Sequence, residues 1–281
     1  TGPGNGNLGI VGPGAELTDI AITYSPEENK SYTLGSFDTP FGQHIGSLSN
    51  NADTFNNHFI ANSLLYDVFA GPVGTLNTLG LLSAYNYGKE HIQFAITNGT
   101  REDAGNSDGN FGLVLSAQTT RLSDKLSLGL GLMKSNDETD TTAGFRTDFE
   151  AAIVDFSYSI NMYSGIKGYY STLDFNDSNS ATDDTVTSWM LESYYETKQY
   201  VFAAGISQWL PKDNDGNGTT NDLPNVGFGR QKNGNALTAT DQDVTRYQIG
   251  ITKKLEENIQ LKTELLFDDY AKTKHDTVGI M

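Results

Sequence analysis

The stretch from Lys125 to Met133, KLSLGLGLM, has leucine at every second position and serine or glycine between the leucines. Side chains of a β-strand point alternately to its two faces, so this pattern predicts a strand with one apolar face. Two further stretches, KEHIQFAITN from Lys89 and NIQLKTELLF from Asn258, alternate in the same way and place mainly polar side chains on the second face. The chain is therefore expected to consist of strands with one apolar and one polar face.

The connections between these strands are expected to alternate in length. Short turns such as NYG, RLSD and ETK are separated by long segments such as GTREDAGNSDG and SNDETDTTAGFR. A soluble β-sandwich is the alternative, but its turns are short at both ends. Long loops at one end and tight turns at the other are typical of outer-membrane barrels, which have an apolar outside and a polar lumen. The sequence thus predicts an all-β fold, a transmembrane antiparallel β-barrel in the outer membrane of a Gram-negative bacterium.

We expect strands at about residues 16–24, 31–38, 75–85, 89–98, 110–120, 125–134, 147–160, 163–173, 185–195, 199–210, 244–254 and 258–270, and one that begins at about residue 277. The first is followed by a short turn, so it should run inward from the exterior, after at least one earlier strand. Such barrels usually have an even number of strands and periplasmic termini. We therefore expect about 14 to 16 strands, with 16 favoured, and N- and C-terminal strands that are missing from this sequence. A barrel of about 16 strands leaves an aqueous channel.

The whole chain, residues 1–281, is expected to form one barrel domain. Residues 59–69 contain apolar side chains, but a strand there would place two short connections in succession and break the alternation. Residues 39–73, with His44, Asp53 and His58, are therefore expected to form one long loop that is a candidate to fold inward and constrict the lumen. The alternatives are an ordinary surface loop and a strand pair with a shortened outer turn.

Composition restricts the function classes. The chain has a net charge of −17 and no cysteine. This acidity argues against binding of nucleic acid, which would need clustered lysine and arginine. No apolar run approaches the roughly 20 residues of a membrane helix, whereas barrel strands give a much weaker hydropathy signal. The lack of cysteine fits an envelope protein that avoids oxidation in the periplasm, although many cytosolic proteins also lack it.

A family resemblance rests on three stretches in about the first hundred residues: AELTDIAITYSPEENKSYTLGSFDTPFG at Ala15 to Gly42, NHFIANSLL at Asn57 to Leu65, and AITNGT at Ala95 to Thr100. They resemble the OmpL-like group of Gram-negative β-barrel porins, in which a strand ends in TPFG and a later strand ends in NG. The resemblance implies passive diffusion of small hydrophilic solutes or ions, and a homotrimer. The chain departs from the usual outer-membrane pattern by ending without a terminal aromatic residue.

The polar strand faces are expected to line the lumen. Acids outnumber bases there, which predicts a modest preference for cations, although each single charge could merely solvate a wet wall. The expected partners are the lipid bilayer and lipopolysaccharide. The expected lumen residues are Asp19, Asp38, Asp155, Lys167, Glu192, Arg246, Lys262, Glu264 and Asp268. Aromatic girdles at the membrane interfaces are expected from Tyr24, Tyr85, Tyr158, Tyr163, Tyr170, Tyr195, Tyr200, Trp209, Tyr247 and Tyr270.

One expected outer loop begins like a calcium-binding loop, with the pattern D-x-D-x-N-G formed by Asp213, Asp215 and Asn217. Pro224 occupies the position of the usual bidentate acid, although Asp222 could substitute. These residue types are also common turn formers, so loose association of calcium is the alternative. No other cofactor is expected.

Catalysis is not expected, because none of the four histidines comes with a motif that would supply a nucleophile and a base. The main alternative to a porin is a structural or adhesive outer-membrane protein, such as a surface-lattice component or a phage receptor. Long acidic loops would serve that role too.

Overall fold

A computed structural model describes residues 21–42, 63–65, 77–97, 111–135, 149–175, 184–212, 227–230, 236–238, 243–256, 259–271 and 277–280. Leu64 and Leu65 have helical backbone. In this described part of the chain, no helix is long and apolar enough to cross a membrane. The strands are β1 (Ala21–Glu27), β2 (Lys30–Asp38), β3 (Asn77–Tyr87), β4 (Glu90–Thr97), β5 (Gly112–Ser123), β6 (Leu126–Ser135), β7 (Phe149–Asn161), β8 (Ser164–Phe175), β9 (Asp184–Glu196), β10 (Tyr200–Lys212), β11 (Gly227–Arg230), β12 (Ala236–Thr238), β13 (Val244–Glu256), β14 (Ile259–Tyr270) and β15 (Thr277–Ile280).

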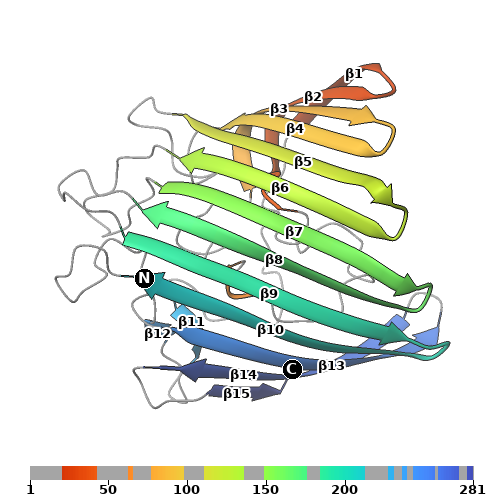
Figure 1. Ribbon diagram of the computed structural model, residues 1–281, viewed down its shortest axis with the longest axis vertical. Coiled ribbons are helices and arrows are strands. Elements are labelled where there is room, and N and C mark those ends of the chain that lie inside the picture. Colours follow the sequence, from red (N-terminus) through yellow and green to blue (C-terminus); the bar gives the residue numbers. More distant parts are fainter. Residues whose placement is uncertain are drawn as a thin grey trace, which may run out of the picture.

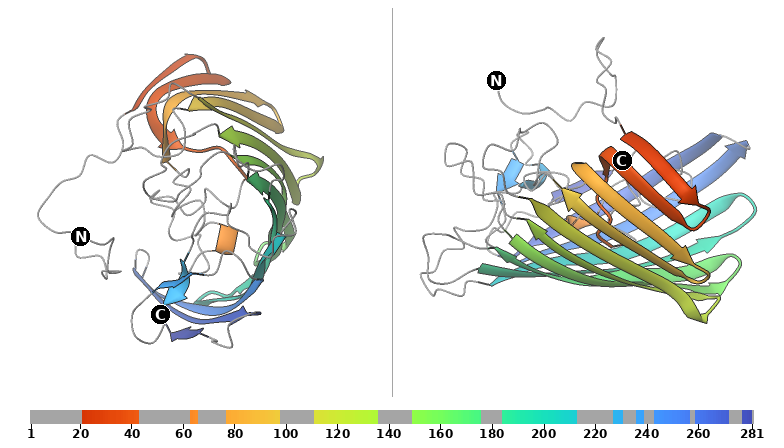
Figure 2. Two further views of the ribbon diagram at one scale, coloured as in Figure 1. Left: turned by 90° about the vertical axis from the view of Figure 1, so that its left-hand side faces the viewer. Right: turned by 90° about the horizontal axis from the view of Figure 1, so that it is seen from above.

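Thirteen of these strands form one antiparallel sheet in the order β1 to β10, then β13, β14 and β15 (Figure 1). Each strand pairs with the strands before and after it in this order, as in an up-and-down meander. The sheet is strongly curved, and residues 63–65 lie on its concave side (Figure 2, left). Among the described residues the sheet does not close, because β1 and β15 lie at its two edges. The all-β, antiparallel prediction is confirmed, while the number of strands in a closed barrel stays a prediction.

The connections alternate in length, as the sequence predicts. Six of the connections within the main sheet contain two or three residues and lie together at what we call the short-turn end (Figure 1, right). The connections at the opposite end, the long-loop end, contain at least six residues. The segment between β10 and β13, expected as a loop, also contains the small sheet of β11 and β12. Strands of three or four residues are too short for an alternating pattern to reveal them.

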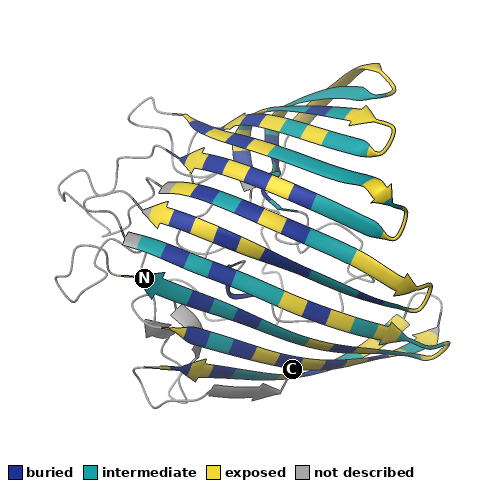
Figure 3. Cartoon of the chain, viewed as in Figure 1, coloured by how far each residue is buried: buried dark blue, intermediate teal, exposed yellow. Residues whose placement is uncertain are grey.

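The two faces of the main sheet differ in polarity and exposure, and buried and exposed residues alternate along the strands (Figure 3). In β6, Leu130 and Leu132 are exposed, whereas Met133 is buried in one cluster with Leu64 and Leu65. Because residues 63–65 lie on the concave side, the buried face is the concave one. The convex face exposes many large apolar side chains, among them Ile22, Leu34, Leu79, Leu81, Phe94, Leu113, Leu115, Val154, Leu191, Phe202, Ile249, Ile251, Leu261 and Leu265.

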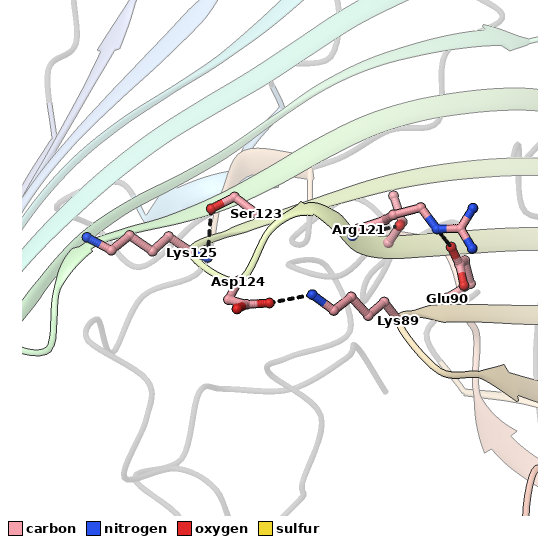
Figure 4. A network of polar contacts seen from close by, with 7 residues as sticks. Lys89, Glu90, Arg121, Ser123, Asp124 and Lys125 are labelled. Carbon is pink, nitrogen blue, oxygen red and sulfur yellow. Dashed lines mark hydrogen bonds and ion pairs between the residues drawn. The ribbon is translucent and has the colours of Figure 1, made fainter.

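A network of ion pairs joins two hairpins at the short-turn end (Figure 4). The Lys89 ammonium lies 2.5 Å from a carboxylate oxygen of Asp124, which belongs to the turn between β5 and β6. Next to it, Arg121 Nε lies 2.8 Å from Glu90 Oε1. These contacts connect the turn after β3 to the turn after β5, so they reinforce the pairing of β4 with β5.

The Lys89–Asp124 pair makes the protonation of Asp124 sensitive to its partner. The hydrogen bond from Lys89, followed by the attraction of its charge, holds the pKa of the Asp124 carboxyl below its ordinary value. A lowered folded-state pKa contributes stability that is present above the unfolded pKa and is lost as pH falls through the folded pKa. We therefore expect Lys89→Gln to raise the pKa of Asp124, as measured by NMR titration of its carboxyl carbon.

Lys125→Gln is the matched control for this titration, because the Lys125 ammonium donates to the carbonyl oxygen of Ile160 at 3.3 Å. The pKa of Asp124 should stay in place in this variant. An equal rise in both variants would show that the general charge of the rim, and not the Lys89 contact, lowers the pKa.

Candidate functional site

The concave face gathers charged side chains from β7 to β14. Register places them on the same face as the buried interior cluster, because directly opposite residues of antiparallel strands share a face. For example, Arg246 lies opposite Asp268, and both are almost fully buried. The predicted lumen residues on this face are Asp155 on β7, Lys167 on β8, Glu192 on β9, Arg246 on β13, and Lys262, Glu264 and Asp268 on β14.

Several of these charges form pairs across neighbouring strands. Arg246 donates from Nε to Asp268 Oδ1 at 2.8 Å and from Nη2 to Asp268 Oδ2 at 2.9 Å, which is a bidentate arrangement. The Lys167 ammonium lies 3.3 Å from Glu192 Oε1. The Gln248 amide nitrogen donates to Glu264 Oε1 at 2.9 Å. These partners compensate the cost of placing charges on a mostly enclosed surface.

The Lys254–Glu196 ion pair extends this charged wall towards the short-turn end. Both residues are half-exposed and lie on the concave face of β13 and β9. This pair is not among the predicted lumen residues, although the same alternation that places Glu192 and Arg246 inward also places Glu196 and Lys254 inward.

Asp38, predicted to face the lumen, lies on the convex side. It pairs with Asn77, two positions along from the Ser36–Leu79 pair, and the Leu79 side chain is exposed on the convex face. The neighbouring residue Phe37 belongs instead to the interior cluster. Strict alternation from Phe37 therefore turns Asp38 outward.

Two of the aromatic residues expected in membrane-interface girdles also point the other way. Trp209 and Tyr270 are 0% and 2% exposed and belong to the interior cluster. Trp209 lies opposite Val244, which is a member of the same cluster. A position near a strand end indicates how close an aromatic residue lies to an end of the barrel wall. Whether the residue faces outward or inward depends on its odd or even position along the strand.

The remaining predicted site residues lie outside the described residues. They are Asp19, the loop residues His44, Asp53 and His58, and the calcium candidates Asp213, Asp215, Asn217 and Asp222. Within the described ranges, no group of three or more histidine, cysteine, aspartate or glutamate residues is arranged to hold a metal ion.

The interior is packed unevenly along its length. Towards the short-turn end, the concave face carries polar side chains that are partly exposed, such as Gln93, Ser157 and Lys262. Towards the long-loop end, the same face is buried and includes the apolar side chains Leu173 and Val186. The change occurs within single strands, since Lys262 is partly exposed and Glu264, two residues later on β14, is 1% exposed. The accessible part of the interior therefore lies at the short-turn end.

The TPFG sequence after β2 explains part of this packing. The Phe41 backbone N–H donates to the Thr39 carbonyl at 2.8 Å, which closes a tight turn around Pro40. The Thr39 hydroxyl donates to the hydroxyl of Thr78 on β3 at 3.3 Å and ties this turn to the wall. Phe41 is then 1% exposed within the interior cluster, although β2 ends only three residues earlier.

Three interior residues, Phe41, Leu64 and Leu65, are not among the residues predicted from the sequence to line the lumen. The first lies in the TPFG motif and the others in NHFIANSLL, so two of the three stretches that carry the family resemblance supply these side chains to one cluster. These three residues lie outside the strands, where side chains do not alternate between two faces. Alternation along the sequence therefore does not reveal their contacts.

Solved structures of outer-membrane proteins are similar in fold to this chain. The loop L8 deletion mutant of OmpT, an outer membrane protein of Vibrio cholerae, superposes with a TM-score of 0.62 at 13% identity, over 94% of this chain and 78% of that chain. The fold is that of an outer-membrane β-barrel protein. The outer membrane channel DcaP of Acinetobacter baumannii gives a TM-score of 0.59 at 11% identity, over 89% and 68% of the two chains.

The trimer form of in-vitro folded Vibrio cholerae OmpT is also similar, with a TM-score of 0.56 at 12% identity, over 89% of this chain and 72% of that chain. No protein-family model matches the sequence, and no curated protein sequence matches it significantly. At these identities the likeness shows a porin-like fold, and a shared fold does not by itself imply a shared function.

Proposed function

We propose that the protein is an outer-membrane porin through which small hydrophilic solutes diffuse passively. The observation that supports this most directly is the reversed polarity of the curved sheet. Its concave face carries ion pairs such as Arg246–Asp268, whereas its convex face exposes leucine, isoleucine and phenylalanine. This distribution suits a wall with lipid outside and a polar lumen inside. DcaP, which shares the fold, is an outer membrane channel.

Planar-bilayer recording of the purified, refolded protein tests this proposal. A porin should insert with discrete current steps of uniform size, and heat-denatured protein should give none. A folded protein that never conducts but forms ordered arrays would favour a surface-lattice component instead.

We also propose that the channel has a modest preference for cations. Among the described inward side chains, the acids Asp155, Glu192, Glu196, Glu264 and Asp268 exceed the bases Lys167, Arg246, Lys254 and Lys262 by one. The surplus is small because most of these charges have a partner of opposite sign. The whole chain carries a net charge of −17, which concentrates cations near its surface.

We expect the reversal potential in a potassium chloride gradient to have the sign of a cation-preferring channel. Its magnitude should fall when the salt concentration is raised on both sides, because salt screens the wall charges. A reversal potential of anionic sign would contradict the preference, and it would leave the channel function itself in place.

We propose that the exposed convex face contacts the lipid bilayer and lipopolysaccharide. A groove of about 460 Å³ on this face is lined by Phe94, Leu115 and Leu132, and it reaches the Lys134–Glu150 ion pair near the long-loop end. An apolar groove with charged groups at one end suits the acyl chains and headgroups of the bilayer and of lipopolysaccharide. A homotrimer is proposed as well, because the similar OmpT protein has a trimer form.

We also propose that the protein belongs to the OmpL-like group of porins. The sequence resemblance in the TPFG and NHFIANSLL segments supports this membership. Phe41 from the first segment and Leu64 and Leu65 from the second share one buried cluster. We also propose that residues 39–73 constrict the lumen.

A further inference from the structure

Four tyrosines gather on the convex face at the short-turn ends of β1, β2 and β3, where the first two hairpins lie side by side (Figure 1). Tyr24 lies directly opposite Tyr32. Tyr85 lies directly opposite Ile92, an exposed residue of the convex face, and Tyr87 follows two residues later on the same face. We call Tyr24, Tyr32, Tyr85 and Tyr87 the tyrosine patch.

The rings of the tyrosine patch contact one another and leave two rings open to the surroundings. The rings of Tyr32 and Tyr85 meet edge to face with their centroids 6.2 Å apart, and their hydroxyl oxygens lie 3.3 Å apart. The rings of Tyr85 and Tyr87 are stacked, with centroids 6.5 Å apart. Tyr24 and Tyr87 are 66% and 52% exposed. Because the face of a tyrosine ring attracts cations, the patch offers a surface for a positively charged group.

Charged groups of both signs border the tyrosine patch. The Lys30 ammonium lies 2.9 Å from Glu27 Oε1. Glu90, which forms an ion pair with Arg121, is directly opposite Tyr87. A surface that binds anionic lipids carries a surplus of lysine and arginine. Here each of these two cations has an acid beside it, so the surface suits a molecule that itself carries both charges.

The Lys30–Glu27 pair offers separate contacts to the two charges of such a molecule. An ammonium has three N–H donors, so Lys30 can bind a phosphate oxygen while it keeps its contact with Glu27. The side chain of Glu27 is 57% exposed and can accept a hydrogen bond from an amine. Lys30 is directly opposite Tyr85, which places this ion pair at the edge of the tyrosine patch.

We propose that the tyrosine patch and the Lys30–Glu27 pair form a headgroup site for phosphatidylethanolamine, a lipid whose headgroup carries one ammonium and one phosphate. The short turns of outer-membrane barrels lie on the periplasmic side, so the site faces the inner leaflet. The ammonium binds the Glu27 carboxylate and the exposed tyrosine rings, and the phosphate binds Lys30. This inference rests on the proposed contact of the convex face with lipid.

Native mass spectrometry of the refolded protein in detergent measures the headgroup preference. The protein is mixed with equal amounts of phosphatidylethanolamine and phosphatidylglycerol that carry the same acyl chains, and the ratio of the two one-lipid complexes is recorded. The natural protein should favour phosphatidylethanolamine. Tyr87→Leu keeps an apolar side chain and removes one exposed ring, so it should lower the ratio about two- to fivefold, the effect of losing one exposed cation–π contact.

Tyr195→Leu is the matched control for this variant. Tyr195 is 55% exposed on the convex face at the short-turn end of β9, and strands β4 to β8 separate β9 from β3 in the sheet order. Both variants keep the net charge of −17, so a general repulsion of the anionic lipid affects them equally. The ratio should stay unchanged in Tyr195→Leu. Equal ratios in the natural protein and both variants, or equal falls in the two variants, would overturn the inference.

Reversal of one charge tests the role of Glu27. Glu27→Lys replaces the acceptor of the ammonium by a second cation beside Lys30, so the ratio should shift towards phosphatidylglycerol. Glu28→Lys changes the net charge equally at the next residue, which is exposed in the turn between β1 and β2, and it should shift the ratio less. Shifts of equal size would contradict the role of Glu27.

These measurements need no current, so their outcome is independent of the channel function. Heat-modifiable migration on gels checks that each variant is folded. Equal retention of the two lipids by the natural protein would contradict the headgroup site. It would leave the lipid contact of the convex face in place if an arginine at the exposed position 94 destabilises the protein in a bilayer.

Discussion

Phe94→Arg should destabilise the folded protein in a lipid bilayer by about 2–4 kcal/mol, the cost of a lipid-facing arginine near the membrane midplane. Phe94 lies near the middle of β4 and exposes 41% of its surface on the convex face. In water, an exposed arginine would cost little, so a loss of this size requires lipid around the convex face. Urea titration of the protein folded in phospholipid vesicles measures the change.

Gln93→Arg is the matched control on the same strand. Gln93 is the preceding residue, so it faces the concave side, where it is partly exposed among polar side chains. We expect the arginine there to reach water and to change the free energy of unfolding much less. Equal losses at positions 93 and 94 would contradict the assignment of lipid to one face and water to the other.

Arg246→Ala should destabilise the folded state by about 3–5 kcal/mol, the usual cost of removing one partner of a buried ion pair. Asp268 is 0% exposed and receives two hydrogen bonds from Arg246. Without the guanidinium, this buried carboxylate would keep its charge with less compensation.

The double variant Arg246→Met with Asp268→Leu distinguishes two causes of the loss. One is the buried Asp268 charge left without its partner, and the other is the lost packing of the Arg246 side chain. It removes both charges and keeps apolar volume, so it should recover much of the stability that Arg246→Ala loses. Lys30→Ala is a control for an exposed pair, since the Lys30–Glu27 contact of 2.9 Å lies at the short-turn end and should contribute little. A double variant no more stable than Arg246→Ala would show that other contacts of Arg246 cause the loss.

The strands and the direction of most side chains could be predicted because alternation is a local property. The leucines of β6 are spaced by two residues, and this spacing alone indicates that Leu130 and Leu132 share a face. The same reasoning places Glu192 and Arg246 on the polar face, and the register agrees. It fails at Trp209, where a position near the strand end weighs more in the prediction than the parity of the residue along the strand. It also fails at Asp38, whose predicted inward direction disregards the inward-facing neighbour Phe37.

The packing of the interior could not be predicted in this way. The contact of Phe41 with Gly131 joins residues that are far apart in the sequence and lie outside a common hairpin. Alternation shows that Glu264 faces inward, but it does not show that this side chain is almost completely covered. Burial depends on what fills the concave side, and the residues that do so follow no strand period.

The uneven filling of the interior has an electrical consequence for a conducting pore. The same current crosses every section of a pore, so an applied voltage falls mainly where the resistance is highest. In this protein the concave side chains are buried in the long-loop half, so we expect that section there. One elementary charge moved through 100 mV gains or loses about 2.3 kcal/mol. A permeating ion would therefore experience most of this work in the long-loop half, and little of it along the more accessible stretch beside Gln93.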